Sequence, residues 1–336
     1  MPEPLLDVRD LHVTFTTEDG LVKAVDGVSF TVMPGESLGV VGESGSGKSV
    51  TFLTIMGLIR PEQADIEGQI LFRGQDLLQL SRDEQREFRG SKMSMIFQDP
   101  LTSLHPYYKV GVQIAEAIRL HEDVSKKEAL ERAVEMLDKV NIPQPERRAK
   151  QYPHEFSGGM RQRAMIAMAL ALNPDLLIAD EPTTALDVTV QAQILDLVDT
   201  LRSEFNAAVV VVTHDLGVVA EHCDNIQVMY AGKAVEYGRT DDIYYRPHHP
   251  YTWGLLGSIP RLGQELERLN PIRGMPPSLI HVPSGCAFHP RCPYVFDRCK
   301  VEVPALLPSD GFHAAACHLS LEDKERILAE EVLARR

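Results

Sequence analysis

Short runs of apolar residues recur along the chain, and most of them end in polar or glycine-rich segments. They are Leu38–Val41, Met93–Phe97, Leu176–Ala179 and Ala208–Thr213. Runs of this length, without polar residues in alternate positions, are typical of strands that are covered on both faces of a sheet. The pattern therefore predicts a central, buried sheet. The pattern also predicts a hairpin of two strands, Ile226–Tyr230 and Lys233–Tyr237, around Ala231-Gly232.

The N-terminal segment follows a different pattern. Between residues 5 and 37 apolar and polar positions alternate, which predicts half-buried strands, the second of them Ala24–Val32. Ile66–Leu71 is a further short strand. Phe15 and Val25 are either core residues or a platform for a nucleotide base; the pattern favours neither.

From Val110 onward the spacing of apolar residues becomes helical. Capping boxes at Ser81–Glu84 and Ser125–Glu128 predict two helix starts. We expect residues 99–164 to form a mostly helical insertion between strands of the sheet. At the C-terminus, Ser320–Arg336 reads as a short charged helix or a frayed end.

Composition and charge exclude some classes of function. The chain has 336 residues, which suggests about two domains, and its net charge of -14 argues against a protein that binds nucleic acid in bulk. The longest unbroken apolar run, Ala164–Leu172, is nine residues, about half of what a membrane span needs. The N-terminus lacks the basic and apolar regions of a signal peptide, so we expect the cytoplasm.

Candidate chemistry begins directly after the first buried run, with Gly42-Glu43-Ser44-Gly45-Ser46-Gly47-Lys48-Ser49. This stretch fits the phosphate-binding P-loop, and a predicted strand before it and a helix, Ser49–Met56, after it supply the context that the motif needs. The glycines allow the backbone to wrap an anion with N–H groups, and the helix adds its positive end. Lys48 can reach the β- and γ-phosphates, and Ser49 can bind Mg²⁺.

Polar side chains follow three of the other buried runs. They are Gln98, Asp180, Glu181 and His214. The carboxyl ends of strands in open α/β sheets face the ligand crevice. Asp180 and Gln98 therefore suit the Mg²⁺ shell, Glu181 suits a general base, and His214 suits a contact to the γ-phosphate or the attacking water. Taken singly, a loop glutamine and a structural histidine remain alternatives.

Ser157-Gly158-Gly159 predicts a second anion site at the start of the helix Met160–Leu172. One triphosphate needs only the P-loop, so this second site would serve a nucleotide held by another subunit. An ordinary serine-capped helix is the alternative. Asp187 could likewise do no more than cap the helix Val190–Leu201.

These features stand in one order along residues 5–260, and together they resemble the ATP-binding subunit of ABC transporters. The resemblance implies an α/β P-loop NTPase fold of the ABC type, with an antiparallel β subdomain and a helical subdomain. It also implies a nucleotide-sandwich dimer in which the P-loop faces the other subunit's signature residues, here Ser157, Gly158, Gly159 and Gln162. Phe15 would stack on adenine, Gln98 would begin the loop that couples to the membrane subunits, Asp187 would lie in the D-loop, and His214 would be the switch histidine.

Three segments narrow the resemblance to the dipeptide and oligopeptide importers, closest to their first ATPase subunit. They are Ile96–Leu104, Asp180–Val188 and His249–Thr252. This branch implies a second homologous ATPase subunit, two membrane-spanning subunits and an extracytoplasmic peptide-binding protein, with the chain peripheral at the cytoplasmic face of the membrane. Nickel or glutathione import, a soluble ABC protein of DNA repair or translation, and a redox sensor are the alternatives.

The segment after residue 260 is rich in proline and carries Cys286, Cys292, Cys299 and Cys317, spaced C-x5-C-x6-C-x17-C. A disulfide framework is not expected in a cytoplasmic chain, and a metal would supply folding energy that loops cannot. In the peptide-importer branch this segment resembles one that carries a 4Fe–4S cluster. Zinc, with His289, His313 or His318 as substitute ligands, and free thiols are the alternatives, whereas we interpret Cys223 as a structural thiol.

The predicted domain organisation is therefore threefold. Residues 1–98 and 165–260 would form a split nucleotide-binding core. Residues 99–164 would form the helical subdomain, with the signature residues near its end. Residues 261–336 would form a small cysteine-rich extension that binds a metal or a cluster.

Overall fold

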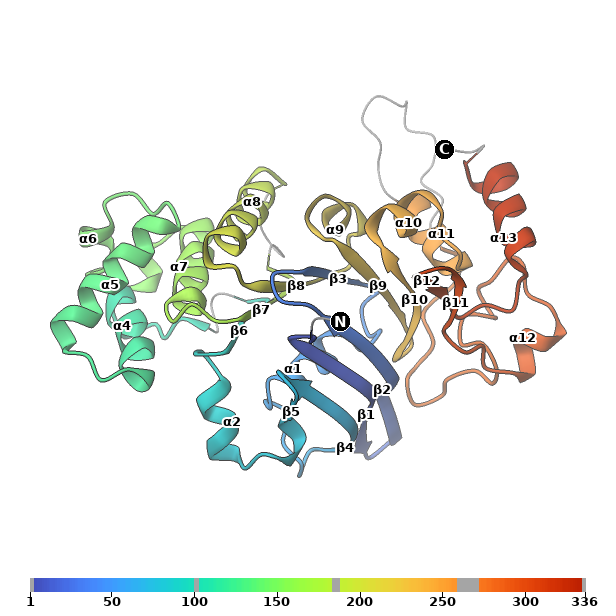
Figure 1. The fold of residues 1–336 in the computed structure, drawn as a ribbon, viewed down its shortest axis with the longest axis horizontal. Helices are drawn as coiled ribbons and strands as arrows, with labels where there is room; N and C mark the ends of the chain where they lie inside the picture. The colour runs from blue at the N-terminus through green and yellow to red at the C-terminus, as the bar shows by residue number, and fades with distance from the viewer. Residues whose placement is uncertain (1–2, 100–102, 183–187, 259–271, 334–336) are drawn as a thin grey trace. The chain divides into compact units, whose positions relative to one another are not determined.

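The computed structural model describes residues 3–99, 103–182, 188–258 and 272–333. The chain forms two compact units, each built from several segments (Figure 1). The first unit gathers Met1–Leu5, Val32–Glu36 and Asp76–Val212, and the second gathers Leu6–Thr31, Ser37–Gln75 and Thr213–Arg336.

Three parallel strands form the sheet of the first unit. They are β6 (Met93–Ile96), β7 (Leu176–Asp180) and β8 (Ala208–Thr213), with β7 in the middle. Every residue of the three strands is buried, as the unbroken apolar runs predicted. Parallel pairing places the carboxyl ends of the strands at one edge, which is where Gln98 and Glu181 follow.

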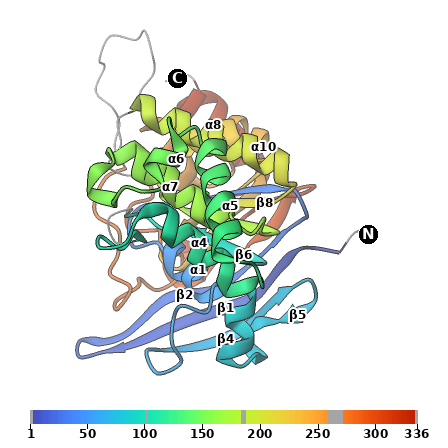
Figure 2. The same ribbon diagram turned by 90° about the vertical axis from the view of Figure 1, so that its left-hand side faces the viewer.

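Helices make up most of the rest of this unit. They are α2 (Arg82–Phe88), α4 (Val110–His121), α5 (Lys126–Lys139), α6 (Pro145–Arg148), α7 (Gly158–Leu170) and α8 (Val188–Phe205), with 3₁₀ turns η1 (Leu77–Gln79) and η2 (Pro153–Glu155). Helices α4, α5 and α7 pack on one another, as Figure 2 shows. Ser81 and Ser125 cap α2 and α5 as predicted, although the reciprocal bond of a capping box forms only at Ser81.

The N-terminal part of the second unit is an antiparallel sheet, in the order β2-β1-β4-β5. Its strands are β1 (Leu6–Thr17), β2 (Gly20–Val32), β4 (Ala64–Phe72) and β5 (Gln75–Asp76). Helix α1 (Lys48–Ile55) packs on this sheet through Phe52, whose ring centroid lies 5.8 Å from that of Phe30 on β2. The predicted alternation of apolar positions is confirmed by the buried face of β1.

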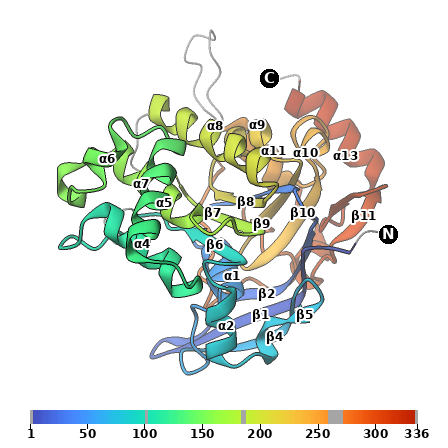
Figure 3. The same ribbon diagram turned by 60° about the vertical axis from the view of Figure 1, so that its left-hand side comes forward.

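The second unit also contains a mixed set of strands. Strand β3 (Ser37–Val41) pairs in parallel with β9 (Asn225–Tyr230), and β9 forms the predicted hairpin with β10 (Lys233–Arg239). Figure 3 shows α9 (Leu216–His222), α10 (Thr240–Tyr245) and α11 (Pro250–Gly257) grouped beside these strands.

The C-terminal segment continues this sheet. Strand β12 (His313–Ala315) pairs with β10, and β11 (Leu307–Asp310) pairs with β12. Short helices α12 (Asp297–Val301) and α13 (Leu321–Ile327) and a π-helical turn η3 (Leu328–Leu333) complete it. The threefold domain division stays a prediction, but part of the expected extension is thus joined to the core by backbone pairing.

Candidate nucleotide site

The P-loop lies between the end of β3 and the start of α1, in the predicted strand–loop–helix order. Gly47 caps α1 with a φ of 98°, which L-residues rarely adopt, and a Cβ there would lie 2.2 Å from the carbonyl oxygen of Ala24. A Cβ on Gly42 would lie 2.2 Å from the carbonyl oxygen of Met229 on β9. Both glycines are therefore required for the close approach of the loop to its neighbouring strands.

Lys48 is buried and folds back over the loop. Its Nζ donates to the carbonyl oxygens of Gly42, at 2.7 Å, and Glu43, at 3.0 Å, and lies 3.4 Å from the Oγ of Ser46. The ammonium group of Lys48 therefore lies inside the loop that would bind the anion. Phosphate oxygens can replace them, because an ammonium group carries three donors and turns freely on its stem.

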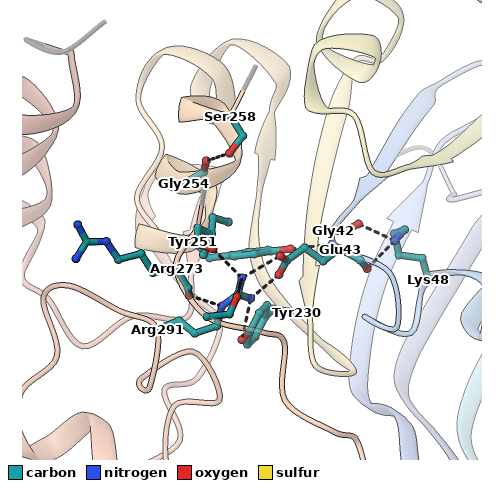
Figure 4. A network of polar contacts seen from close by, with 11 residues as sticks. Gly42, Glu43, Lys48, Tyr230, Tyr251, Gly254, Ser258, Arg273 and Arg291 are labelled. Atoms are coloured by element: carbon teal, nitrogen blue, oxygen red, sulfur yellow. Dashed lines mark hydrogen bonds and ion pairs between the residues drawn. The ribbon is translucent and has the colours of Figure 1, made fainter. Parts of the chain in front are cut away.

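Glu43 has partners that the sequence pattern did not suggest (Figure 4). Its carboxylate forms a two-pronged ion pair with Arg291, at 2.5 and 2.9 Å, and its backbone N–H donates to the hydroxyl of Tyr251 at 2.8 Å. Neither Arg291 nor Tyr251 was a predicted nucleotide-site residue. The sequence did contain one signal for such a partner: an acidic residue inside a phosphate-binding loop, whose negative charge needs a compensating cation.

The acids at the end of β7 lie in the first unit. Asp180 is the last residue of the strand and is buried. Glu181 follows with a φ of 46°, and its N–H donates to the carbonyl oxygen of Val212 at 2.8 Å. A positive φ is strained for a residue other than glycine, so the predicted general base has an unusual backbone conformation directly after the strand.

Gln98 and Glu181 are brought together because they follow adjacent parallel strands, β6 and β7. The Nε2 of Gln98 donates to the Oε2 of Glu181 at 2.7 Å, although the residues are 83 positions apart. The contact fixes the position of the Glu181 carboxylate, which as an ionised acid can accept several hydrogen bonds.

The remaining predicted residues lie as follows. Ser157 caps α7 by accepting the N–H of Met160 at 3.3 Å, and Ser157 and Gly158 are exposed, whereas Gln162, one turn on, is buried. His214 is exposed and follows β8 directly. Phe15 is half-buried on β1, opposite Ala64.

The predicted D-loop residue Asp187 lies outside the described residues. Its assignment therefore stays a prediction, and so does its possible capping of α8.

The four tail cysteines converge on one cavity in the second unit. Cys286, Cys292, Cys299 and Cys317 line it together with Phe288, Tyr294 and the imidazoles of His249, His289 and His318. Burial raises the pKa of the Cys286 thiol to about 11 and that of Cys292 to about 12, and it also raises the pKa of Cys317. Among the described residues, no three ligand side chains are close enough together to form a finished metal site.

Backbone N–H groups point at three of these sulfurs. The N–H of Phe288 donates to Cys286, that of Tyr294 to Cys292 and that of Leu319 to Cys317, and each of these bonds lowers the pKa of its thiol against the effect of burial. In all three cases a donor stands two residues after the cysteine. Such bonds stabilise a thiolate.

Comparisons with known proteins agree with this geometry. Residues 25–184 match the family model "ABC transporter", and residues 235–299 match "Oligopeptide/dipeptide transporter, C-terminal region". The chain is 51% identical over 319 residues to the oligopeptide transport ATP-binding protein OppD of Haemophilus influenzae, covering 95% of this chain and 98% of that protein. It is 52% identical over 318 residues to the dipeptide transport ATP-binding protein DppD of Bacillus subtilis, covering 94% and 95%.

Solved structures show the same fold. The ATP-binding cassette MJ0796, in a dimeric post-hydrolysis state bound to ADP and Pi, superimposes with a TM-score of 0.63 at 28% identity, covering 70% of this chain and 98% of the cassette. CbiO1 of Clostridium perfringens, part of the transporter complex cbiONQ, superimposes with a TM-score of 0.61 at 26% identity, covering 73% and 92%.

Proposed function

Because the chain belongs to the ATP-binding subunits of oligopeptide and dipeptide ABC transporters, we propose that residues 42–49 bind Mg-ATP and that Glu181 activates the water that hydrolyses it. Hydrolysis by such subunits is coupled to transport, here the import of peptides. The observation that carries the catalytic assignment is the Gln98–Glu181 hydrogen bond at the edge of two parallel strands.

Each residue of the site has a task in this proposal. Lys48 exchanges its loop carbonyls for phosphate oxygens, backbone N–H groups between residues 44 and 49 bind the same anion, and Phe15 stacks on adenine. Glu181 takes a proton from water, and His214 donates to the γ-phosphate.

The donor set also fits Mg²⁺. Ser49, Gln98 and Asp180 offer a hydroxyl, an amide and a carboxylate oxygen, which are the hard ligands that this ion prefers. When bound, Mg²⁺ neutralises charge on the phosphates.

The exposed N-terminal residues of α7 support a second ATPase subunit as a partner. Ser157 and Gly158, with Gly159 and Gln162, would complete the nucleotide site of a second, homologous ATPase subunit, and the dimeric cassette among the structural relatives supports this arrangement. Two membrane-spanning subunits and an extracytoplasmic peptide-binding protein complete the transporter. In the described part of the chain no helix is long and apolar enough to cross a bilayer. Membership of this family supports a place at the cytoplasmic face of the membrane, where the membrane-spanning partners would hold the subunit.

We also propose that the four tail cysteines hold a metal centre, a 4Fe–4S cluster in preference to zinc. Their convergence on one cavity supports this, since Cys299 is buried there and the other three thiols are half-buried beside it, and so do the backbone N–H groups directed at three of the sulfurs. Wide loops between the cysteines suit a cluster better than a zinc ribbon. The centre would supply structural cross-links.

Replacing the base tests the catalytic assignment. Glu181→Gln keeps the size and the hydrogen bond to Gln98 but removes the proton acceptor, so ATP should still bind and trap the closed dimer while turnover falls by a factor of about 100 or more. ATP binding, gel filtration with Mg-ATP and phosphate release measure the three effects.

A matched variant controls for loss of one negative charge. Glu67 is exposed on β4, so Glu67→Gln should leave turnover unchanged. Wild-type rates of phosphate release in Glu181→Gln would show that another group is the base.

A further inference from the structure

The P-loop contains an unfavourable charge. Of the eight residues 42–49, Glu43 alone is acidic and Lys48 alone is basic. A carboxylate at the start of a loop that must hold a triphosphate would repel the ligand, and the repulsion between like charges is strong where water is partly excluded. Some group must therefore cancel the charge of Glu43.

Arg291 is that group. Its side chain is only 5% exposed, and both of its terminal nitrogens contact the Glu43 carboxylate, at 2.5 and 2.9 Å. Its Nε donates to the carbonyl oxygen of Arg273 at 3.0 Å (Figure 4). Its guanidinium lies over the rings of Tyr230 and Phe288, at 5.8 and 5.9 Å from their centroids. A two-pronged pair with this many additional contacts has a fixed geometry.

The backbone of Glu43 is held by the same aromatic cluster. Tyr251, which is fully buried, accepts the Glu43 N–H, and its ring packs at 4.7 Å from Tyr230 and 5.4 Å from Phe288. Side chain and main chain of one P-loop residue are thus both fixed by residues more than 200 positions away.

Arg291 also belongs to the cysteine loop. It lies between Cys286 and Cys292, directly before the latter, and its N–H donates to the carbonyl oxygen of Phe288 at 3.0 Å. The segment that carries two of the four tail cysteines therefore also carries the cation that contacts the P-loop.

We propose that Arg291 is a positioning residue of the nucleotide site: it neutralises Glu43 and fixes the first turn of the P-loop, so that the C-terminal cysteine loop sets the affinity for ATP. The inference rests on the proposed binding of ATP by residues 42–49. It assigns a nucleotide-site role to a segment that lies outside the ATP-binding motifs.

Mg-ATP affinity of four proteins tests the proposal: wild type, Arg291→Ala, Glu43→Gln and the double variant. Arg291→Ala should raise the Kd about tenfold, because Glu43 then repels the phosphates, and added salt should reduce the deficit by screening that repulsion. The double variant should regain most of the affinity, and Glu43→Gln alone should bind ATP at least as tightly as wild type.

Charge rescue and salt dependence separate this role from a purely structural one. If Arg291 merely stabilised the fold, removing Glu43 as well would restore nothing. Should Arg291→Ala fail to fold, Glu43→Gln and Arg291→Lys keep the test open: the lysine retains the charge without the two-pronged geometry, so its Kd should rise only slightly. Weaker binding by Glu43→Gln would overturn the proposal.

Arg298→Ala is the matched control. Arg298 also lies in the cysteine-bearing segment and also forms a two-pronged pair, with Glu302, but its side chain is 56% exposed and makes no P-loop contact in the described structure. Its Kd should equal that of wild type. Wild type that fails to bind Mg-ATP would refute the proposed function, whereas equal Kd values for wild type and Arg291→Ala would refute this inference alone.

Discussion

At the scale of single residues, the P-loop depends on glycines for two separate reasons. Gly47 needs both a positive φ and an empty position beside the Ala24 carbonyl, whereas Gly45 needs only the positive φ, because nothing lies within 4 Å of the position its Cβ would take. The two costs can be separated by adding the same methyl group at each site.

Gly47→Ala should therefore destabilise the protein more than Gly45→Ala. A left-handed alanine costs about 1–2 kcal/mol, which both variants share, and the contact with backbone adds to it only at position 47. Urea denaturation without nucleotide measures the difference. Equal losses would mean that the loop relaxes away from β2 at no cost.

Glu181 is the second residue whose conformation matters. Its positive φ is maintained by the N–H bond to Val212 and by the contact to Gln98. Strain of this kind persists where surrounding contacts over-determine the backbone, which is common at sites of catalysis.

At the scale of elements, helix α11 shows how one side chain can make an element sensitive to pH. His249 caps the helix: its Nδ1 accepts the N–H of Tyr251 at 3.1 Å, and the residue is 1% exposed. Burial lowers the pKa of His249 to about 3 and that of the adjacent His248 to about 4. The folded protein therefore holds both rings neutral.

We expect the free energy of unfolding to fall as pH drops below about 6.5. Below this pH the two histidines bind protons in the unfolded chain but stay neutral in the folded chain. His248 and His249 should therefore each lower the free energy of unfolding by about 2 kcal/mol between pH 6.5 and pH 5. Urea denaturation at both pH values measures the loss.

His249→Asn is the matching variant, because asparagine can cap a helix but does not titrate. Its stability should depend less steeply on pH, with the His248 contribution left in place. An unchanged pH dependence would show that His249 is not one of the groups responsible.

At the scale of the whole molecule, the C-terminal segment is integrated with the unit that carries the P-loop. Strand β12 extends the sheet from β10, and Ile327 and Leu328 pack on Trp253 of α11. Trp253 is the one tryptophan of the chain, so its fluorescence reports the packing of this segment.

Metal analysis of anaerobically purified protein tests the proposed centre. About four irons and four sulfides per chain would indicate a cluster, and one zinc without sulfide a zinc site. Cys292→Ser should abolish the metal and shift the Trp253 transition to lower denaturant, because metal binding contributes folding free energy.

Cys223→Ser is the control here. Cys223 is buried away from the cavity of the tail cysteines, next to β3, and its replacement should leave the metal content unchanged. Wild-type protein that contains neither iron nor zinc would contradict the proposed metal centre and show that the four tail cysteines are free thiols.

Local patterns were sufficient for most of the elements. The buried strands, the hairpin, the P-loop and the cap at Ser157 were all predicted with boundaries close to those observed, because each depends on neighbours in sequence: apolar periodicity, glycine conformation and capping oxygens. The meeting of Gln98 with Glu181 was also predictable, since parallel strands align their carboxyl ends.

The amino-acid sequence by itself thus determined the family, the buried strands and the residues that offer nucleotide chemistry. Tertiary structure alone decided that Arg291 and Tyr251 hold Glu43, that β12 continues the sheet of the P-loop unit, and that four widely spaced cysteines share one cavity. The physical reason is that these contacts join residues tens to hundreds of positions apart, and no local periodicity records which charge, ring or thiol will meet another once the chain is folded.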